Sequence, residues 1–403
     1  MIDLPGLFTI SLVLLMTTFL TLRSPDITKI IFSAFIIRIL FLLINNYIFP
    51  LPDAQMDAKV FEEFAWIWSQ EGFLNIFNYY RGPDPYFISV LLAIPYFLFD
   101  RSLLMLQSLS ILIGILSVYF GWLLTKNFWD SKAATKVGWI LALFPTLVSY
   151  SVLVMREVYI VFFLIIAIYG IVCWFREGKN IKSAFLIIFG FIAATFFHGA
   201  SILGLFVFLF VISLTSINSI LKQVKVGKLG LENLVFVMIS IIVLGLFFTN
   251  NIKIPYIKSM DHLTNKIVIK DTINLKVRGD AAYPDWTKIN NLSELFYKIP
   301  VRTVYFLFSP YPWDIKKMSH LVGLLDSLFH MILVFLIFLN FRVIWKDPAL
   351  RTILLILIVY FIVFGVGVGN FGTGIRHRSK FIFGLLILVA PFIPKLVFHK
   401  KIK

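Results

Sequence analysis

Long apolar stretches constrain this sequence more than any other feature. Eleven of them, each about 16–22 residues long, match the roughly 20 residues that an α-helix needs to cross a bilayer. They lie at about 4–22, 28–49, 104–125, 137–155, 157–175, 183–198, 200–217, 234–249, 320–341, 349–369 and 381–398. We therefore expect an all-α polytopic bundle of about 11 transmembrane helices, in which residues 1–403 form a single membrane-embedded domain.

The composition excludes a soluble globular protein. Sixty per cent of the residues are hydrophobic, only 14% are charged, and the mean hydropathy is +0.91. Such values are typical of polytopic membrane proteins. A shorter apolar piece at 87–99 contains Pro95 and is too short to span comfortably, so we expect a juxtamembrane or re-entrant helix there.

Basic residues predict which loops face the cytoplasm. Seventeen Lys and Arg residues, against five acids, fall on alternate loops and on the C-terminal tail. They are Arg23, Lys29, Lys126, Lys132, Lys136, Arg176, Lys179, Lys182, Lys222, Lys225, Lys228, Arg342, Lys346, Arg351, Lys400, Lys401 and Lys403. By the positive-inside rule these loops are cytoplasmic, which puts the N-terminus outside and the C-terminus inside. The rule accounts for much of the net charge of +16, so we expect no nucleic-acid partner.

The outer side then comprises a first loop at 50–103, short turns near 156 and 199, a long loop at 250–319 and the stretch 370–380. We expect the protein in the bacterial inner (cytoplasmic) membrane, with its active site facing the periplasm. The last outer stretch, within "GNFGTGIRHRSK", breaks the charge rule with Arg376, Arg378 and Lys380 beside His377. One interpretation is an incidental exception. The other is an outward-facing anion site, because the planar guanidinium of Arg binds phosphate through paired hydrogen bonds.

The first outer loop is acidic. Its segment "PDAQMDAKVFEEFAWIWSQEG" reads as an amphipathic helix, with Val60, Phe61, Phe64 and Trp68 at helical spacing. Asp53 and Asp57 are four residues apart and share a helical face if the helix begins early enough. They are either a solvated face with an N-terminal cap, or carboxylates beside an apolar surface. Burial would raise the pKa of such a carboxylate and suit it to general-base catalysis.

Other polar residues interrupt the apolar runs. Arg156 and Glu157 form a short outer turn, and His198 occupies the next one; each is either structural or a substrate contact. Arg38 lies in the middle of the second span. Asp326 and His330 lie at i, i+4 in the ninth, where a buried structural pair is the simpler interpretation.

Several classes of chemistry lack their motifs. The sequence has no phosphate-binding P-loop, no G-x-G-x-x-G, no H-E-x-x-H and no His/Cys metal spacing. Its one cysteine, Cys173, lies in an apolar run and provides no disulfide framework. We expect no cofactor and assign no metal ligand, although a divalent metal is left open. The basic outer loop at 250–319 contains "YPDW" and "FSPYPWD", whose aromatic residues suit either sugar stacking or a membrane surface.

Taken together, the chain resembles the GT-C superfamily of membrane glycosyltransferases that use polyprenyl-phosphate sugars, in particular its protein-mannosyltransferase and aminoarabinose-transferase branch. The resemblance rests on the Asp-containing loop, on "PYFISVLLAIPYFLFDRSLLMLQSLSILIGILSVYFGWLLTKNFW", on "ALFPTLVSYSVLVMREVYIVFFLIIAIYG" and on "GTGIRHRSKF". It implies a GT-C-like fold with juxtamembrane helices in the first outer loop, a catalytic acid in that loop and a periplasmic cavity. The "RE" turn and the "GTGIRHRSK" stretch also resemble O-antigen and capsule repeat-unit polymerases.

We therefore expect transfer of a sugar from a polyprenyl-(di)phosphate carrier to a glycan, lipid or protein acceptor outside the membrane. The first alternative is an O-antigen or capsular repeat-unit polymerase. The alternative from another class is a flippase or transporter of lipid-linked sugars, which predicts internal repeats that the sequence does not show. The expected general base is Asp57, with Asp53 second. The expected substrate-binding residues are Arg376, Arg378, Lys380, His377, Arg156, Glu157 and His198.

Overall fold

The computed structural model describes residues 3–225, 277, 279–317 and 319–394, and two isolated positions at 238 and 245. In these residues the chain is helical, apart from turns and one isolated β-bridge between Ala282 and Asn370. The helices are α1 (Leu4–Arg23), α2 (Thr28–Tyr47), α3 (Asp57–Ser69), α4 (Phe73–Ile76), α5 (Phe87–Phe99), α6 (Leu103–Phe128), α7 (Ser131–Leu143), α8 (Pro145–Val152), α9 (Glu157–Arg176), α10 (Ile181–Phe197), α11 (Ile202–Lys225), α15 (Leu295–Phe308), α16 (Ser319–Leu339), α17 (Phe341–Lys346), α18 (Pro348–Gly367), α19 (Phe371–Arg378) and α20 (Ile382–Val389).

The number of membrane-crossing helices is lower than expected. Within the described ranges, seven helices are long and apolar enough to span, or eight if α7 and α8, bent by 54° at their junction, count as one. The expected span at 234–249 lies outside the described residues, and α10 has only 17 residues. At 381–398 the structure shows the eight-residue α20 and a 3₁₀ turn before the described residues end. All eight residues of α20 are buried, so the apolar run there reflects packing inside the protein.

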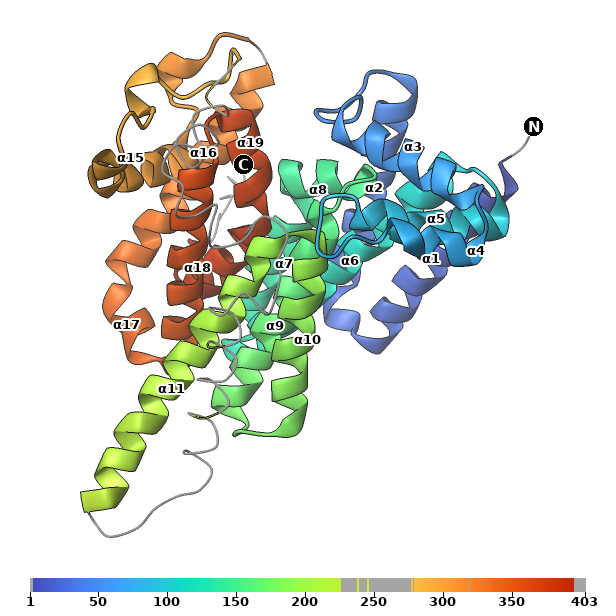
Figure 1. Ribbon diagram of the computed structural model, residues 1–403. Helices are drawn as coiled ribbons and strands as arrows, with labels where there is room; N and C mark the ends of the chain where they lie inside the picture. Colours follow the sequence, from blue (N-terminus) through green and yellow to red (C-terminus); the bar gives the residue numbers. More distant parts are fainter. Residues whose placement is uncertain are drawn as a thin grey trace, which may run out of the picture.

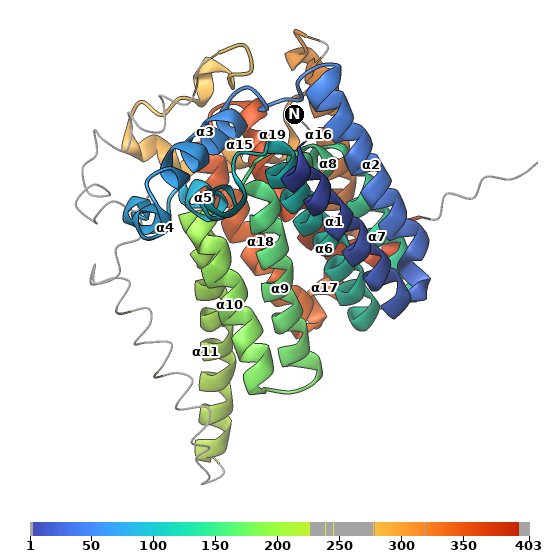
Figure 2. The ribbon, with the colours of Figure 1, turned by 90° about the vertical axis from the view of Figure 1, so that its right-hand side faces the viewer.

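The arrangement is that of a multi-pass membrane protein. Figures 1 and 2 show the long helices side by side, with α3, α5, α15 and α19 gathered toward one end of the bundle (upper end in Figure 2). As predicted, 87–99 forms a short helix, α5, with Pro95 inside it. The predicted amphipathic helix is α3, which buries Phe61 and Trp68 but leaves Val60 exposed.

Ion pairs at the two ends agree with the predicted alternation of the loops. Lys126 binds Asp26 at 2.9 Å, and Arg176 binds Asp347 at 2.9 Å. All four residues come from loops that the basic residues assign to the cytoplasmic side. At the opposite end, the loops predicted to face outward meet in the site described below.

A break between α7 and α8 explains the buried cation of the second span. Pro145 begins α8 and has no N–H, so the carbonyls at the end of α7 lose helical partners there. Arg38, which is 1% exposed, donates from Nη1 to the carbonyl of Ala142 at 3.1 Å and to that of Ala34 at 3.0 Å. Arg38 therefore has a structural role, because it donates to a backbone carbonyl at the break between the two helices.

Candidate functional site

Four charged side chains meet at the end of the bundle that carries α3 and α19. Oε1 of Glu157 lies 3.4 Å from Nζ of Lys380, 3.7 Å from Nε of Arg376 and 3.8 Å from Nε of Arg156. We call these four residues the charge cluster. Glu157 and Lys380 are each 1% exposed. Neither oxygen of Glu157 accepts a hydrogen bond from the described residues, and Nε of Arg376 also lacks a partner there. The ions are therefore held together by charge at distances that leave hydrogen-bonding capacity unused.

Helix α19 brings the basic residues of "RHRSK" to different places. The segment was expected to be a loop, but Asn370 caps a helix, its Oδ1 accepting from the N–H of Thr373 at 2.8 Å. Arg376 lies in this helix, which ends at Arg378, and Lys380 lies in the 3₁₀ turn Ser379–Phe381 that follows. Arg376 and Lys380 both reach Glu157, whereas Arg378 points to another face of the helix than Arg376.

Arg378 is part of the protein interior. It is fully buried, and its Nε donates to Oδ2 of Asp326 at 2.6 Å. Its Nη1 donates to the carbonyl of Ser309 at 2.5 Å, and its Nη2 to the hydroxyl of Ser327 at 2.8 Å. All three of its nitrogens are thus engaged. The structure departs here from the expected phosphate-binding role, because this guanidinium has no free donor to offer.

Asp326 and His330 belong to the same interior network. Asp326 accepts from Arg378, and the His330 ring lies 2.8 Å from the Asp326 carbonyl through Nδ1. Both side chains are almost completely buried. The simpler interpretation from the sequence, a buried structural pair, is the arrangement that the structure shows.

Two carboxylates from the first outer loop border the charge cluster. Asp57, the first residue of α3, binds Nη1 of Arg376 through Oδ2 at 2.5 Å. Asp53 lies outside the helix and accepts a hydrogen bond from the hydroxyl of Tyr150 at 3.2 Å. The two do not share a helical face because α3 begins only at Asp57, and the side chain of Asp53 does not cap it. Tyr150 was missed from the sequence because nothing distinguishes it within its apolar run.

Asp53 has an unusual backbone conformation and a shifted pKa. Its φ is +67°, a left-handed conformation that is uncommon outside glycine and that persists when the surroundings hold it in place. Burial raises the pKa of its carboxyl, and this effect exceeds the opposing influence of Arg376. A carboxylate in this state is more ready to accept a proton than an exposed one.

The cations have shifted proton affinities as well. Burial lowers the pKa of Lys380 to about 7, against the opposing pull of Glu157. Burial alone would lower the pKa of Arg376, but Glu157, Asp53 and Asp57 together raise it. Arg376 is therefore a permanent cation, whereas Lys380 titrates near neutral pH.

Two histidines adjoin Lys380. Nδ1 of His377 lies 2.8 Å from Nζ of Lys380, and the His377 ring is 5.5 Å from that of His198. Burial, followed by the charge of Lys380, lowers the pKa of His377 well below its usual value. The structure thus brings His198, predicted from a separate turn, next to the charge cluster, and it keeps the His377 ring neutral.

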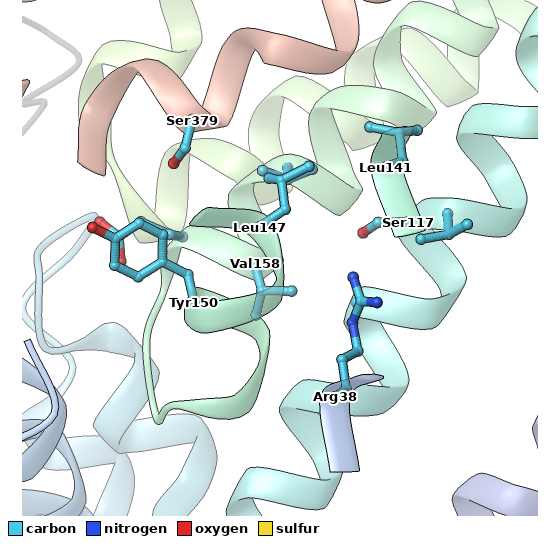
Figure 3. A pocket seen from close by; sticks show the side chains of 11 residues that line it. Arg38, Ser117, Leu141, Leu147, Tyr150, Val158 and Ser379 are labelled. Atoms are coloured by element: carbon cyan, nitrogen blue, oxygen red, sulfur yellow. The ribbon is translucent and has the colours of Figure 1, made fainter. Parts of the chain in front are cut away.

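A small cavity of about 20 Å³ lies under the site, large enough for one water molecule. Glu157, Tyr150 and Ser379 line one side of it and Arg38 and Ser117 the other, as Figure 3 shows for the labelled side chains. Nε of Arg38 is buried without a partner among the described residues. This cavity is too small for a substrate, so ligands must approach from the bundle's end or side.

An apolar groove of about 430 Å³ runs beside the charge cluster, between α5, α6, α9 and α10. Tyr159 is its only lining residue with a polar side-chain atom. Phe197 is one of its lining residues, and the Phe197 carbonyl accepts from Nη1 of Arg156 at 3.4 Å. A lining residue of the apolar groove is therefore bonded to a cation of the cluster.

The turn that carries Arg156 is buried. Leu153 and Val154 are each 2% exposed and Met155 is fully buried, so the chain passes from α8 to α9 inside the protein. This turn was expected to be a short outer one, and its burial is the reason that Arg156 and Glu157 meet Arg376 and not solvent.

The described part of the long outer loop packs near the same end. Tyr283 donates its N–H to the carbonyl of Gly369 at 3.0 Å, next to the bridge between Ala282 and Asn370. Tyr311 and Trp313 stack with ring centroids 5.0 Å apart, and Trp313 is 75% exposed. Among the described residues no group of three His, Cys, Asp or Glu side chains is placed to hold a metal ion.

Comparison with protein-family models, with curated proteins and with solved structures found no match for this chain.

Proposed function

We propose that this chain is a membrane glycosyltransferase that moves a sugar from a polyprenyl-(di)phosphate carrier to a hydroxyl of an envelope acceptor. The observation that carries the proposal is the charge cluster with its two bordering carboxylates. Three cations of a kind suited to phosphate and two carboxylates lie together there, which supports the proposal. The resemblance of the sequence to GT-C transferases points in the same direction.

The cations suit a phosphate leaving group. Arg156, Arg376 and Lys380 surround one carboxylate at 3.4–3.8 Å, and Nε of Arg376 is still without a hydrogen-bond partner among the described residues. A phosphate oxygen that enters this space gains charge-assisted hydrogen bonds, which are stronger than bonds between neutral groups. Stabilising negative charge as it develops on a leaving group is a large part of catalysis in such sites.

The apolar groove gives the carrier a place to lie. A polyprenyl chain is a hydrocarbon, and this groove offers it apolar and aromatic walls that include Phe197. Arg156 donates to the Phe197 carbonyl. A lipid tail in the groove would therefore place its phosphate beside the cluster.

The transfer step needs one base. The acceptor oxygen attacks the anomeric carbon while the bond from that carbon to the phosphate oxygen breaks. The electron pair of the broken bond leaves on the carrier phosphate, and the acceptor proton passes to a carboxylate. We assign that role to Asp53, in place of the Asp57 expected from the sequence. Asp57 is engaged by Arg376 at 2.5 Å, whereas the side chain of Asp53 accepts from the neutral hydroxyl of Tyr150 and its carboxyl has a raised pKa.

The test measures transfer of a radioactive sugar from its polyprenyl-phosphate carrier to the glycolipids of a membrane extract. The enzyme is the full chain in nanodiscs. Asp53→Asn should lose about 10²–10⁴-fold in rate, the usual contribution of a general base. Asp100→Asn is the matched control. Asp100 lies in the same outer loop, is exposed and has the same left-handed backbone, with φ +71°. A fully active Asp53→Asn protein together with an inactive Asp57→Asn protein would return the base to Asp57. Normal rates in both would refute the assignment of a base to this loop.

A parallel reaction with a polyprenyl-diphosphate oligosaccharide distinguishes the two enzyme classes. A ladder of lengthening products from this donor indicates a repeat-unit polymerase. A single added sugar from the monophosphate donor indicates a transferase. If neither donor is consumed while the donor binds and crosses the membrane, the proposal gives way to a transporter.

A further inference from the structure

A second and larger groove, about 780 Å³, opens on the opposite side of the first outer loop. It lies between α1, α2, α3 and α6, and Figure 2 shows α1, α2 and α6 side by side. Ala54 and Ala58 form part of its wall, as do Leu153 and Val154. Ala54 and Ala58 immediately follow Asp53 and Asp57 in the chain, and Val154 lies two residues before Arg156. We call this space the lateral groove.

One end of the lateral groove is rich in amides. Asn46 donates from Nδ2 to Oε1 of Gln107 at 2.9 Å, and Gln107 donates back to Oδ1 of Asn46 at 3.2 Å. Asn45 donates to the same oxygen at 2.8 Å, and Gln55 also lines this end. Each amide carries two donor hydrogens and an acceptor oxygen, so this row keeps capacity for a ligand that both donates and accepts.

Four of the five charged residues that line the groove form ion pairs, and the fifth, Asp3, accepts from the Gly6 N–H and the Ser102 hydroxyl. Glu62 holds Arg101 by two hydrogen bonds at 2.8 and 2.9 Å, and Lys59 lies 3.8 Å from Glu63. No unpaired cation is offered to a phosphate among these four, in contrast to the charge cluster. The chemistry therefore favours an uncharged head group with many hydroxyls.

The other end of the lateral groove is apolar. Leu7 and Ile10 of α1 line it together with Ile39, Leu42 and Leu43 of α2. Both helices are among the candidate membrane spans, and only a third of each is buried in the protein. An alkyl chain lying here would stay within the apolar layer while its head group reached the amides.

We propose that the lateral groove binds the acceptor, and that the acceptor is a membrane-resident amphiphile with a saccharide head. This inference rests on the proposed function and narrows its acceptor class. The acceptor is a lipid-anchored saccharide, and not a soluble glycan or a protein. The saccharide lies along the amide row, and its reactive hydroxyl is directed toward Asp53, the chain neighbour of the lining residue Ala54. The donor occupies the apolar groove on the far side, so two lipid-anchored substrates approach one site from different directions.

The experiment measures binding without any donor. The full chain in nanodiscs is irradiated with a dodecyl maltoside that carries a diazirine in its alkyl chain, and labelled peptides are identified by mass spectrometry. We expect label on α1 and α2 around Ile10 and Leu42. Unlabelled dodecyl maltoside should compete, whereas octaethylene glycol dodecyl ether, with the same tail and no sugar, should not.

Two kinds of variant test the residues. Asn46→Leu should reduce sugar-dependent labelling about fivefold, the usual effect of one lost hydrogen bond. Leu43→Trp fills the groove from a lipid-facing position and should abolish labelling without disturbing buried contacts. Ile36→Trp is the matched control, because Ile36 lies two turns away on the same helix and is 55% exposed, against 43% for Leu43.

Equal competition by both detergents, or label spread evenly over all lipid-facing helices, would mean an adventitious additive only and would overturn the inference. So would unchanged labelling in Leu43→Trp. Each result is separable from the proposed function. If labelling is sugar-specific while Asp53→Asn and Asp57→Asn both keep full transfer activity, the assignment of the catalytic base is refuted and the acceptor groove is not. If transfer depends on Asp53 but labelling is non-specific, the acceptor groove is refuted and the catalytic base is not.

Discussion

Replacing Arg376 by lysine separates the charge of this residue from its shape. Arg376 uses Nη1 to hold Asp57 at 2.5 Å while its Nε faces Glu157 at 3.7 Å. A lysine keeps the positive charge but offers one nitrogen, so it can serve only one of the two carboxylates. The variant therefore keeps either the hydrogen bond to Asp57 or the ionic contact with Glu157, and a lysine that turns to Glu157 loses a hydrogen bond to a charged group, which contributes about 1.5–3 kcal/mol. At 1.36 kcal/mol per tenfold, this predicts a decrease in transfer rate of roughly 10- to 150-fold.

Arg378→Lys, two residues away, is the contrasting variant. It removes hydrogen bonds to Asp326, to Ser327 and to backbone carbonyls in a fully buried position. Breaking a buried ion network costs about 3–5 kcal/mol. We therefore expect lower membrane abundance and a lower thermal midpoint for Arg378→Lys, with a smaller decrease in the thermal midpoint for Arg376→Lys.

The assay is single-turnover transfer in nanodiscs, with each variant's abundance and thermal midpoint measured on the same preparation. Wild-type turnover in Arg376→Lys would refute the argument that its fork positions the site. A well-folded Arg378→Lys protein that loses only turnover would move the phosphate contact back to Arg378, as the sequence alone suggests.

Three further predictions follow from the site. Glu157→Gln leaves buried cations without their carboxylate, so the thermal midpoint should fall, and added inorganic phosphate should restore part of it; an unchanged midpoint would mean that the cations do not depend on Glu157 for compensation. The transfer rate should rise with pH as Asp53 loses its proton and should fall again above about pH 7 as Lys380 loses its proton. Lys380→Arg should abolish this decrease at high pH; a decrease that persists in the variant would come from another group. Cysteines at Asp130 and Gly372 should be labelled from opposite sides of the membrane, and labelling from one side would contradict the topology.

The sequence predicted the long helices well because hydrophobic length is a local property. Helices such as α2, α6 and α18 fall close to the expected runs, and α5 was recognised as too short to span. α20 was not predictable in the same way. An apolar run surrounded by protein and one surrounded by lipid have the same composition, so the sequence could not show that α20 is wrapped by its neighbours.

The site was predicted in its parts but not in its pairings. Arg376, Arg378 and Lys380 were assigned one role because the segment was taken as a loop. In the structure Arg376 and Arg378 lie two residues apart in α19 and point to different faces, and Lys380 follows in the 3₁₀ turn Ser379–Phe381. Asn370 ahead of this segment was the available signal, since asparagine is a favoured N-cap. The contact between Arg376 and Asp57 joins residues 319 positions apart, and no single-sequence pattern predicts such a pairing.

The buried turn between α8 and α9 fixes the length of the chain at this point. Loops on a protein surface tolerate insertions because their backbone is hydrated, and the exposed turn around Gly178 is such a place. The turn at 153–155 has no such freedom, since its side chains are at most 2% exposed and it delivers Arg156 and Glu157 to the charge cluster. Related chains that keep this site should therefore vary in length at the α9–α10 turn and keep a constant number of residues between α8 and α9. An epitope tag or a reporter domain belongs at the former position, because at the latter it would separate Glu157 from its cations.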